Sequence, residues 1–291
     1  MEAQQLVFSL PHTQLRGQSW SNDESDAPVL IALHGWLDNG ASFLQCLPYI
    51  GGYRCLAIDL AGHGLSDHRG NGSFYHLWDY VQDVVYLIRQ QQGPVVLLGH
   101  SLGGAVAILV AAILPESISK LIVLDSVGPL VEKATERVTS LVKAIKSMHV
   151  NAGRSVKGYD SMDAMIMARS QGFTSLSMEA AEHLVVRGSY QGSDGKWFWR
   201  HDSALKFPSP YKMDEESVRE FMAKITCPTL MLFAEQGLFS SDDVRLQERV
   251  EQIPVVVTKW LPGNHHFHLE PITAPAVRAE IQRFIRQNNY E

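Results

Sequence analysis

The sequence predicts an α/β fold in which helices flank a mostly parallel central sheet. Short apolar segments alternate with helical stretches along most of the chain, which is the pattern of a sheet covered on both faces. The alternation stops between Gly128 and Ile225, where roughly 100 residues lack parallel-strand signals and have the pattern of helices with turns. Such an insertion is typical of a cap over the carboxyl edge of the sheet, where α/β folds bind ligands.

The apolar segments place the strands of the expected sheet. Parallel strands are expected at Val29–Leu33, Cys55–Asp59, Val95–Leu98, Leu121–Asp125, Thr229–Phe233 and Val255–Trp260, and an antiparallel edge pair at Leu6–Leu10 and Leu15–Trp20. Helices are expected over Phe74–Gln91 and Ala274–Gln287. We therefore expect a core of residues 1–127 and 226–291 and a helical cap of residues 128–225, inserted after the sixth strand.

Within the expected cap, Leu130–His149 has apolar residues at helical spacing. Ser161 and Ser177 are candidate N-caps of two further helices, and Gly188 is a candidate stop. Taken singly, each methionine and aromatic side chain of the cap is expected to pack in the cap's own core. As a set they could line an apolar pocket under the cap: Met162, Met165, Met167, Met178, Trp197, Phe198 and Trp199.

Composition excludes several classes of function. The net charge of −6 disfavours nucleic acid and anionic membrane surfaces as partners. Cys46, Cys55 and Cys227 are widely spaced, which predicts reduced core residues rather than disulfides or metal ligands. The chain starts without the basic and apolar regions of a secretory signal, and its longest apolar run, Ala105–Leu114, is too short to cross a bilayer. A cytoplasmic protein without stable membrane association is expected.

The run GHSLGG at Gly99–Gly104 is the most specific motif of the chain. It follows an apolar strand and opens into an apolar helix, which is the context of a G-x-S-x-G nucleophile elbow. The sharp turn of such an elbow holds the serine hydroxyl clear of the sheet. The motif therefore predicts Ser101 as a nucleophile.

A serine hydroxyl needs a base that accepts its proton. On this fold the base should follow the last strand, where Leu261–Pro271 (LPGNHHFHLEP) offers His265, His266 and His268. His268 is expected to pack inward, and position alone does not choose between the other two. A metal site built from the three histidines is a weaker alternative, because no other ligand cluster supports it.

Two further parts of the mechanism are needed. An oxyanion hole requires backbone N–H groups, which the loop His34–Asn39 (HGWLDN) can supply from Trp36 and the start of the elbow helix from Leu102. A carboxylate must orient the histidine. Asp125, Glu235, Asp242 and Asp243 all follow strands that end at the same edge of the sheet, so position leaves this choice open.

These motifs resemble those of the α/β-hydrolase superfamily over nearly the whole chain outside the cap. The resemblance rests on HGW at His34–Trp36, DLAGHGLS at Asp59–Ser66, GHSLGG at Gly99–Gly104 and GNHHFHLEP in the last loop. HGWLDN, AGHGLSDH and the cap segment RGSYQGSDGKWFWRHD are also similar to the serine hydrolase-like protein group. The resemblance implies the α/β-hydrolase fold.

The resemblance also assigns roles. The superfamily's H-x-x-H-x-E pattern implies that His265 is the base and His268 a structural partner. Serine in the nucleophile position disfavours haloalkane dehalogenase and epoxide hydrolase activities, which use aspartate there. Many members carry the acid in a G-x-x-D after the later strand, where this chain has Gly237. Some members instead place it where this chain has Asp125, so Asp125 is favoured, then Asp242 or Asp243, then Glu235.

The expected function is that of a serine hydrolase of carboxylesterase type. It would cleave a small to medium, apolar ester through an acyl-enzyme on Ser101, with a small-molecule ester as partner and with neither cofactor nor metal. Alternatives are hydrolysis of a thioester or a carbon–carbon bond, or acyl transfer, with the same residues. An alternative of another class is a ligand-binding or signalling protein that has lost turnover, which the glycine at position 237 favours.

Overall fold

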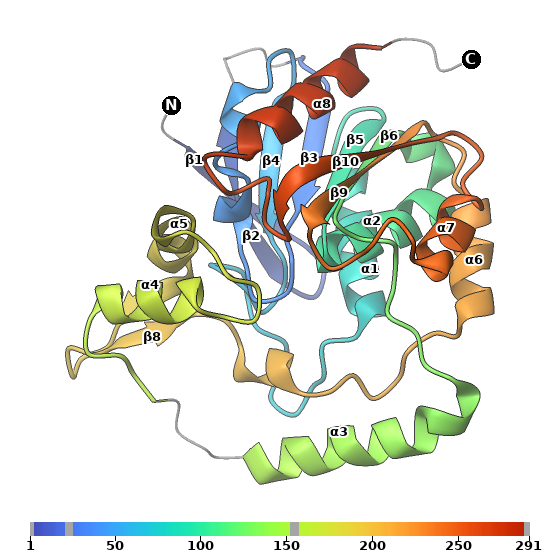
Figure 1. Cartoon of the computed structure of the whole chain (residues 1–291). Helices are drawn as coiled ribbons and strands as arrows, with labels where there is room; N and C mark the ends of the chain where they lie inside the picture. Colours follow the sequence, from blue (N-terminus) through green and yellow to red (C-terminus); the bar gives the residue numbers. More distant parts are fainter. Residues whose placement is uncertain (1–2, 21–25, 152–156, 288–291) are drawn as a thin grey trace.

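The computed structural model describes residues 3–20, 26–151 and 157–287, and an eight-stranded sheet forms its centre (Figure 1). The strands lie in the order β1 (Gln4–Ser9), β2 (Gln14–Trp20), β4 (Arg54–Asp59), β3 (Val29–Leu33), β5 (Val95–His100), β6 (Ile118–Leu124), β9 (Thr229–Gln236) and β10 (Val256–Asn264). The pairs β1–β2 and β2–β4 are antiparallel, and all the other pairs are parallel. The mostly parallel sheet and its antiparallel edge pair are confirmed.

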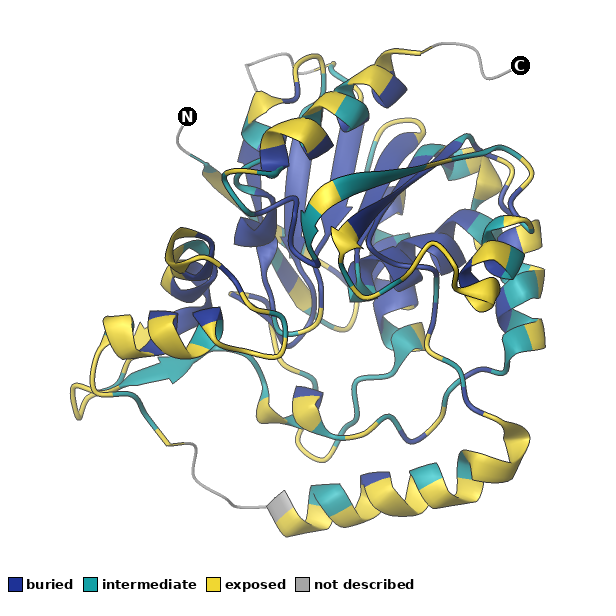
Figure 2. Cartoon of the chain, in the orientation of Figure 1, coloured by how far each residue is buried: buried dark blue, intermediate teal, exposed yellow. Residues whose placement is uncertain are grey.

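The strands at the centre of the sheet are largely apolar, because helices cover both faces of the sheet. Every residue of β3 and of β5 is buried (Figure 2). One face packs against α1 (Leu77–Arg89) and α2 (Leu102–Ile113). The other face packs against α8 (Ala274–Arg286). A strand buried on both faces reads as a continuous apolar run, which is why the sequence located these strands to within a few residues.

The connection from β6 to β9 carries most of the remaining helices. It contains α3 (Arg137–Asn151), α4 (Met162–Ser170), α5 (Met178–Gly188), a hairpin of β7 (Ser189–Gln191) and β8 (Trp197–Trp199), and α6 (Glu215–Ala223). A short α7 (Val244–Val250) follows β9. Ser161 and Ser177 accept hydrogen bonds from the N–H groups of Ala164 and Ala180, which confirms both as N-caps. The helix α5 ends at Gly188, as expected.

Three features of this connection differ from expectation. The helix α3 begins at Arg137 rather than at Leu130, and Val138 on its apolar side is 76% exposed. The hairpin β7–β8 was not expected, because strands of three residues are too short to show a period. The helix α6 packs its buried Val218 and Met222 into the core cluster that also contains α2. We therefore propose that the cap ends before α6.

The described residues contain no helix that is both long and apolar enough to cross a bilayer.

Candidate active site

Ser101 lies at the turn between β5 and α2. Its backbone has φ +51° and ψ −114°, in the region that residues with a side chain rarely adopt. The turn brings backbone into such close contact that a Cβ on Gly99 would lie 2.2 Å from the carbonyl oxygen of Gly103. A Cβ on Gly103 would lie 2.1 Å from the carbonyl oxygen of Leu33. The glycines of the elbow are therefore required by the close approach of three chain segments.

Residues with strained backbone conformations cluster at the carboxyl ends of the parallel strands. Leu37, Ser101 and Asp125 are the non-glycine residues with positive φ in the part of the chain that the structure describes. All three line one cavity, although they follow three different strands. Such conformations cost about 1–3 kcal/mol each and cluster at functional sites.

The structure brings Asp125 to His265. The Nδ1 atom of His265 lies 2.5 Å from Oδ2 of Asp125, and both residues are buried. The Asp125 carboxylate also accepts hydrogen bonds from the N–H groups of Ala234 (3.2 Å) and Leu238 (3.1 Å). Ala234 lies in β9 and Leu238 follows it, so the later strand holds the carboxylate without supplying it.

The other three candidate carboxylates lie elsewhere. Glu235 and Asp242 are exposed, and Asp243 caps the first turn of α7. Gly237 occupies the position where the superfamily pattern described above implies the acid of many members, and a Cβ there would lie 2.5 Å from Oδ2 of Asp125. The Asp125 carboxylate therefore fills the space that a side chain at position 237 would need.

The two neighbouring histidines have different surroundings. His268 is buried, and its Nε2 lies 3.0 Å from the Ser42 hydroxyl oxygen, which agrees with the inward packing expected for it. His266 is also buried, and its Nε2 donates to Oδ2 of Asp38 at 3.0 Å. Asp38 also accepts from Nη2 of Arg169 at 2.9 Å. Sequence reasoning assigned no role to Asp38 or Arg169; the only signal was an aspartate two residues after Trp36.

Asp38, His100 and His266 form the one group in the described residues whose ligand atoms could surround a metal ion, within 4.8 Å of one another. The Nη2 atom of Arg169 lies 2.9 Å from Asp38 Oδ1 and 3.3 Å from His266 Nε2. The guanidinium thus stands where a cation would bind the two side chains. We therefore interpret these residues as side chains paired with other groups of the protein rather than as metal ligands.

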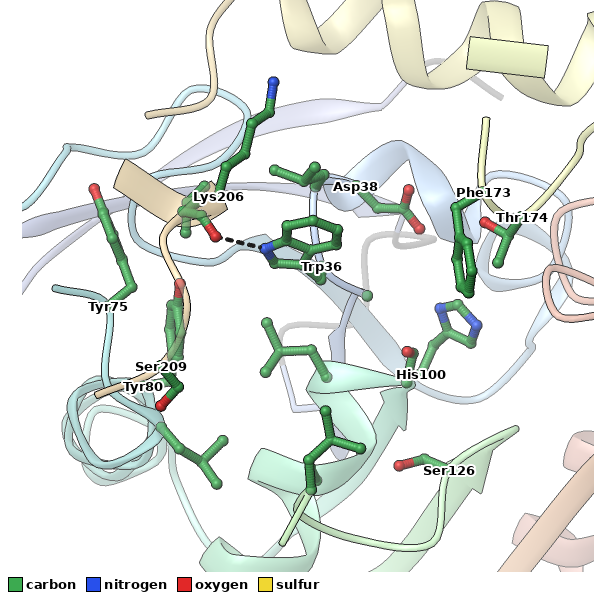
Figure 3. Close-up of a pocket in the computed structure, with 18 of the residues that line it drawn as sticks. Trp36, Asp38, Tyr75, Tyr80, His100, Ser126, Phe173, Thr174, Lys206 and Ser209 are labelled. Atoms are coloured by element: carbon green, nitrogen blue, oxygen red, sulfur yellow. Dashed lines mark hydrogen bonds between the residues drawn. The ribbon is translucent and has the colours of Figure 1, made fainter. Parts of the chain in front are cut away.

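The expected oxyanion donors lie beside the same cavity. Trp36 and Leu102 both line it, and no acceptor for either backbone N–H is found within the described residues. The indole Nε1 of Trp36 donates to the carbonyl oxygen of Leu205 at 2.9 Å (Figure 3). This hydrogen bond fixes the tryptophan side chain against the segment that follows the cap hairpin.

The cavity has a volume of about 910 Å³ and contains Ser101, Asp125 and His265 in its wall. Much of the remaining wall is apolar, from side chains such as Trp78, Phe173, Leu238 and Phe239. Packing within the cap, expected for each cap methionine and aromatic side chain taken singly, is found for Met162, Met165, Trp197 and Trp199, whereas the shared lining of an apolar pocket is not. Of that set only Trp199 lines the cavity, because Met165 packs inside the cap, Met167 and Met178 are exposed, and the others contact the cap's own residues or solvent.

Burial keeps a group of histidines neutral around this site. Desolvation lowers the pKa of His34 and His266 below the ordinary value, and lowers the pKa of His63, His100 and His268 well below it. The rings of His265, His266 and His268 lie 4.6, 5.1 and 4.1 Å from the ring of His100, centre to centre. Positive charge on one ring would therefore repel charge on its neighbours.

These pKa values predict a loss of stability in acid. Below about pH 6.5 the unfolded chain binds protons that the buried histidines of the folded chain do not, so the free energy of unfolding falls as the pH falls. We expect urea unfolding at pH 5.5 to give a value at least about 2 kcal/mol below that at pH 7.5. Replacing the exposed His149 with glutamine should leave this difference unchanged. Equal values at the two pH values would contradict the prediction.

Comparisons with known proteins bear on the fold and the family resemblance. A family model described as the alpha/beta hydrolase fold matches residues 28–147. The chain is 28% identical to a serine hydrolase-like protein of Danio rerio, over 98% of this chain and 89% of that protein. It is also 28% identical to an esterase of Mycobacterium tuberculosis, over 62% of this chain and 59% of that protein.

A solved structure is similar along nearly the whole chain. It is that of a hypothetical protein from Pseudomonas aeruginosa PAO1, with 35% identity and a TM-score of 0.90 over 97% of this chain and 99% of that chain. The α/β-hydrolase fold expected from the motifs is confirmed. The chain therefore has the α/β-hydrolase fold and resembles the serine hydrolase-like proteins, and these relatives support a hydrolase.

Proposed function

We propose that the protein is a serine hydrolase of carboxylesterase type. The observation that carries the proposal is the strained Ser101 in the wall of a cavity that also contains the buried His265–Asp125 pair. If the cavity held the nucleophile elbow without the His265–Asp125 pair, the site would be compatible with a binding protein that has no catalytic turnover. The similarity to a mycobacterial esterase supports the same reaction class.

In the proposed mechanism His265 Nε2 takes the proton of the Ser101 hydroxyl while its oxygen attacks the carbonyl carbon of the ester. Asp125 accepts the hydrogen bond of His265 Nδ1–H, which fixes the tautomer and stabilises the imidazolium. The N–H groups of Trp36 and Leu102 stabilise the oxyanion, and Leu102 N–H lies at the positive end of the α2 dipole. His265 then protonates the leaving alcohol.

Deacylation repeats these steps with water. His265 takes a proton from water, the hydroxide attacks the acyl carbon, and the Ser101 oxygen leaves with the proton that His265 returns. The ester and water are the only reactants that these steps need to balance. The apolar wall around Ser101 supports an ester of small to medium size with an apolar acyl group.

Labelling by a fluorophosphonate tests the nucleophile. We expect the wild-type protein to be labelled and to hydrolyse p-nitrophenyl acetate and butyrate, and the Ser101→Ala variant to do neither. Ser126 lies in the same cavity wall (Figure 3), so Ser126→Ala is a matched control that should still be labelled. The label, located by mass spectrometry, should be on the peptide containing Ser101.

Substrate comparison tests the bond that is cleaved. We expect the kcat/KM of an acetyl or butyryl p-nitrophenyl ester to exceed that of the matching acyl thioester. Absence of both labelling and ester hydrolysis in the wild-type protein would contradict the proposed function. Labelling together with faster thioester cleavage would assign the nucleophile but overturn the esterase specificity.

A further inference from the structure

The loop between β3 and the 3₁₀ helix Gly40–Phe43 makes three polar contacts with the cap. Trp36 Nε1 donates to the carbonyl oxygen of Leu205, Asp38 accepts from Arg169, and Asn39 Nδ2 donates to the carbonyl oxygen of Leu184. Each contact is 2.9 Å long. This loop (His34–Asn39, the oxyanion loop below) contains the N–H group proposed to stabilise the oxyanion.

The loop does not hold its conformation by local preference alone. Leu37 has φ +64°, a strained value for a residue with a branched side chain. Strain of this kind persists only where surrounding contacts over-determine the backbone. Asp38 follows directly, is buried, and makes the only charged contact in the loop among the described residues. Its partners are therefore the ones most able to fix the loop.

Arg169 lies at the junction of two catalytic segments. Its Nη2 contacts Asp38 of the oxyanion loop, and the other oxygen of Asp38 accepts from His266, the neighbour of His265. Burial would raise the pKa of Asp38, but His266 and Arg169 together lower it well below its usual range. The carboxylate is thus charged and paired on both oxygens, which is the condition for a buried ion pair to hold geometry.

The same arginine also contacts the cavity wall formed by the cap. Its Nη1 donates to the carbonyl oxygen of Thr174 at 3.2 Å. Phe173 and Thr174 both line the cavity, and Figure 3 shows them on the same side as Asp38 and His100. Arg169 of α4 therefore connects the cap wall, the oxyanion loop and the loop that contains His265 and His266.

We propose that Arg169 is a positioning residue, through which the cap holds the oxyanion loop in the conformation that stabilises the transition state. Arg169 acts through Asp38 and does not contact the reacting atoms. An oxyanion donor bonds more strongly to the transition state than to the bound ester, so displacing the donor lowers kcat and changes KM little. This inference rests on the proposed serine hydrolase function.

The test is Arg169→Met, which keeps the aliphatic stem and removes the guanidinium. We expect kcat for p-nitrophenyl acetate to fall about 10–10²-fold, with KM within about threefold of wild type. Arg137→Met is the matched control, because Arg137 is also a cap arginine paired with an aspartate, Asp214, at 2.8 Å. That pair does not contact the oxyanion loop, and the control should keep wild-type kcat.

A second readout separates positioning from a loss of folding. A thionoester presents sulfur, which accepts hydrogen bonds poorly, to the oxyanion hole. The ratio of kcat for the ester to kcat for the thionoester should be large in wild type and much smaller in Arg169→Met. Asp38→Asn should reproduce the loss, and the double variant should lose no more than the larger single loss. If Arg169→Met does not fold, Arg169→Lys should retain part of kcat with an intermediate ratio.

Wild-type kcat with a lowered Tm in Arg169→Met would overturn the proposal, since it would show a structural role only. A raised KM at unchanged kcat would also overturn it, because it would place Arg169 in substrate binding. Failure of the proposed function has a different signature: wild type and Arg137→Met would then both show neither labelling nor hydrolysis.

Discussion

Replacing Asp125 with asparagine should lower kcat for p-nitrophenyl esters by about 10³–10⁴-fold. Asparagine has the size of aspartate and tolerates the positive φ of +41° at this position. It can still accept from the N–H of Ala234 or Leu238, so the fold should be retained. It cannot stabilise the imidazolium of His265, and its amide can favour the wrong tautomer.

The Asp242→Asn variant is the control that shows whether the loss of kcat is specific to Asp125. Asp242 follows the same strand as the usual acid but is exposed, so Asp242→Asn should keep kcat within about threefold of wild type. The Tm of both variants, measured by circular dichroism, should remain close to that of wild type. A large loss of kcat in Asp242→Asn with near wild-type activity in Asp125→Asn would contradict the assignment of the acid.

Much of the fold could be predicted because its signals are local. A parallel strand buried on both faces is a short apolar run, and the elbow around Ser101 needs glycines within five residues of one another. His265 followed from its position after the last strand together with the pattern of a related superfamily. The signals that predict these elements lie within short, continuous segments of the sequence.

The remaining parts depend on contacts between distant residues. Asp125 and His265 are 140 positions apart, and Arg169 and Asp38 are 131 positions apart. Nothing near Asp125 distinguishes it from an aspartate that merely ends a strand. Apolar spacing from Leu130 predicted a helix, but the chain forms a separate 3₁₀ turn at Ala134–Glu136 before α3 begins. The cap lacks the regular alternation that located the sheet strands.

Gly237 should be nearly as sensitive as Asp125, although it carries no reactive group. We expect Gly237→Asp to lower kcat about 10²-fold or more, because a Cβ at this position would lie 2.5 Å from Asp125 Oδ2. The new carboxylate would displace the old one and repel it. Gly237→Ala tests the steric part alone, and kcat/KM with p-nitrophenyl butyrate measures both. Wild-type kcat in Gly237→Asp would show that the carboxylate has room to move.

Exchanging the two residues tests whether position 237 can carry the acid. Asp125→Gly alone should lose about 10³–10⁴-fold in kcat, since glycine accepts the positive φ but leaves His265 without a partner. Adding Gly237→Asp should then recover at least about tenfold, whereas the same change in wild type is harmful. If Gly237→Asp lowers kcat in wild type but raises it in the Asp125→Gly variant, the two positions share one carboxylate site. If Gly237→Asp lowers kcat in both wild type and Asp125→Gly, only the residue that follows β6 can present an acid to His265.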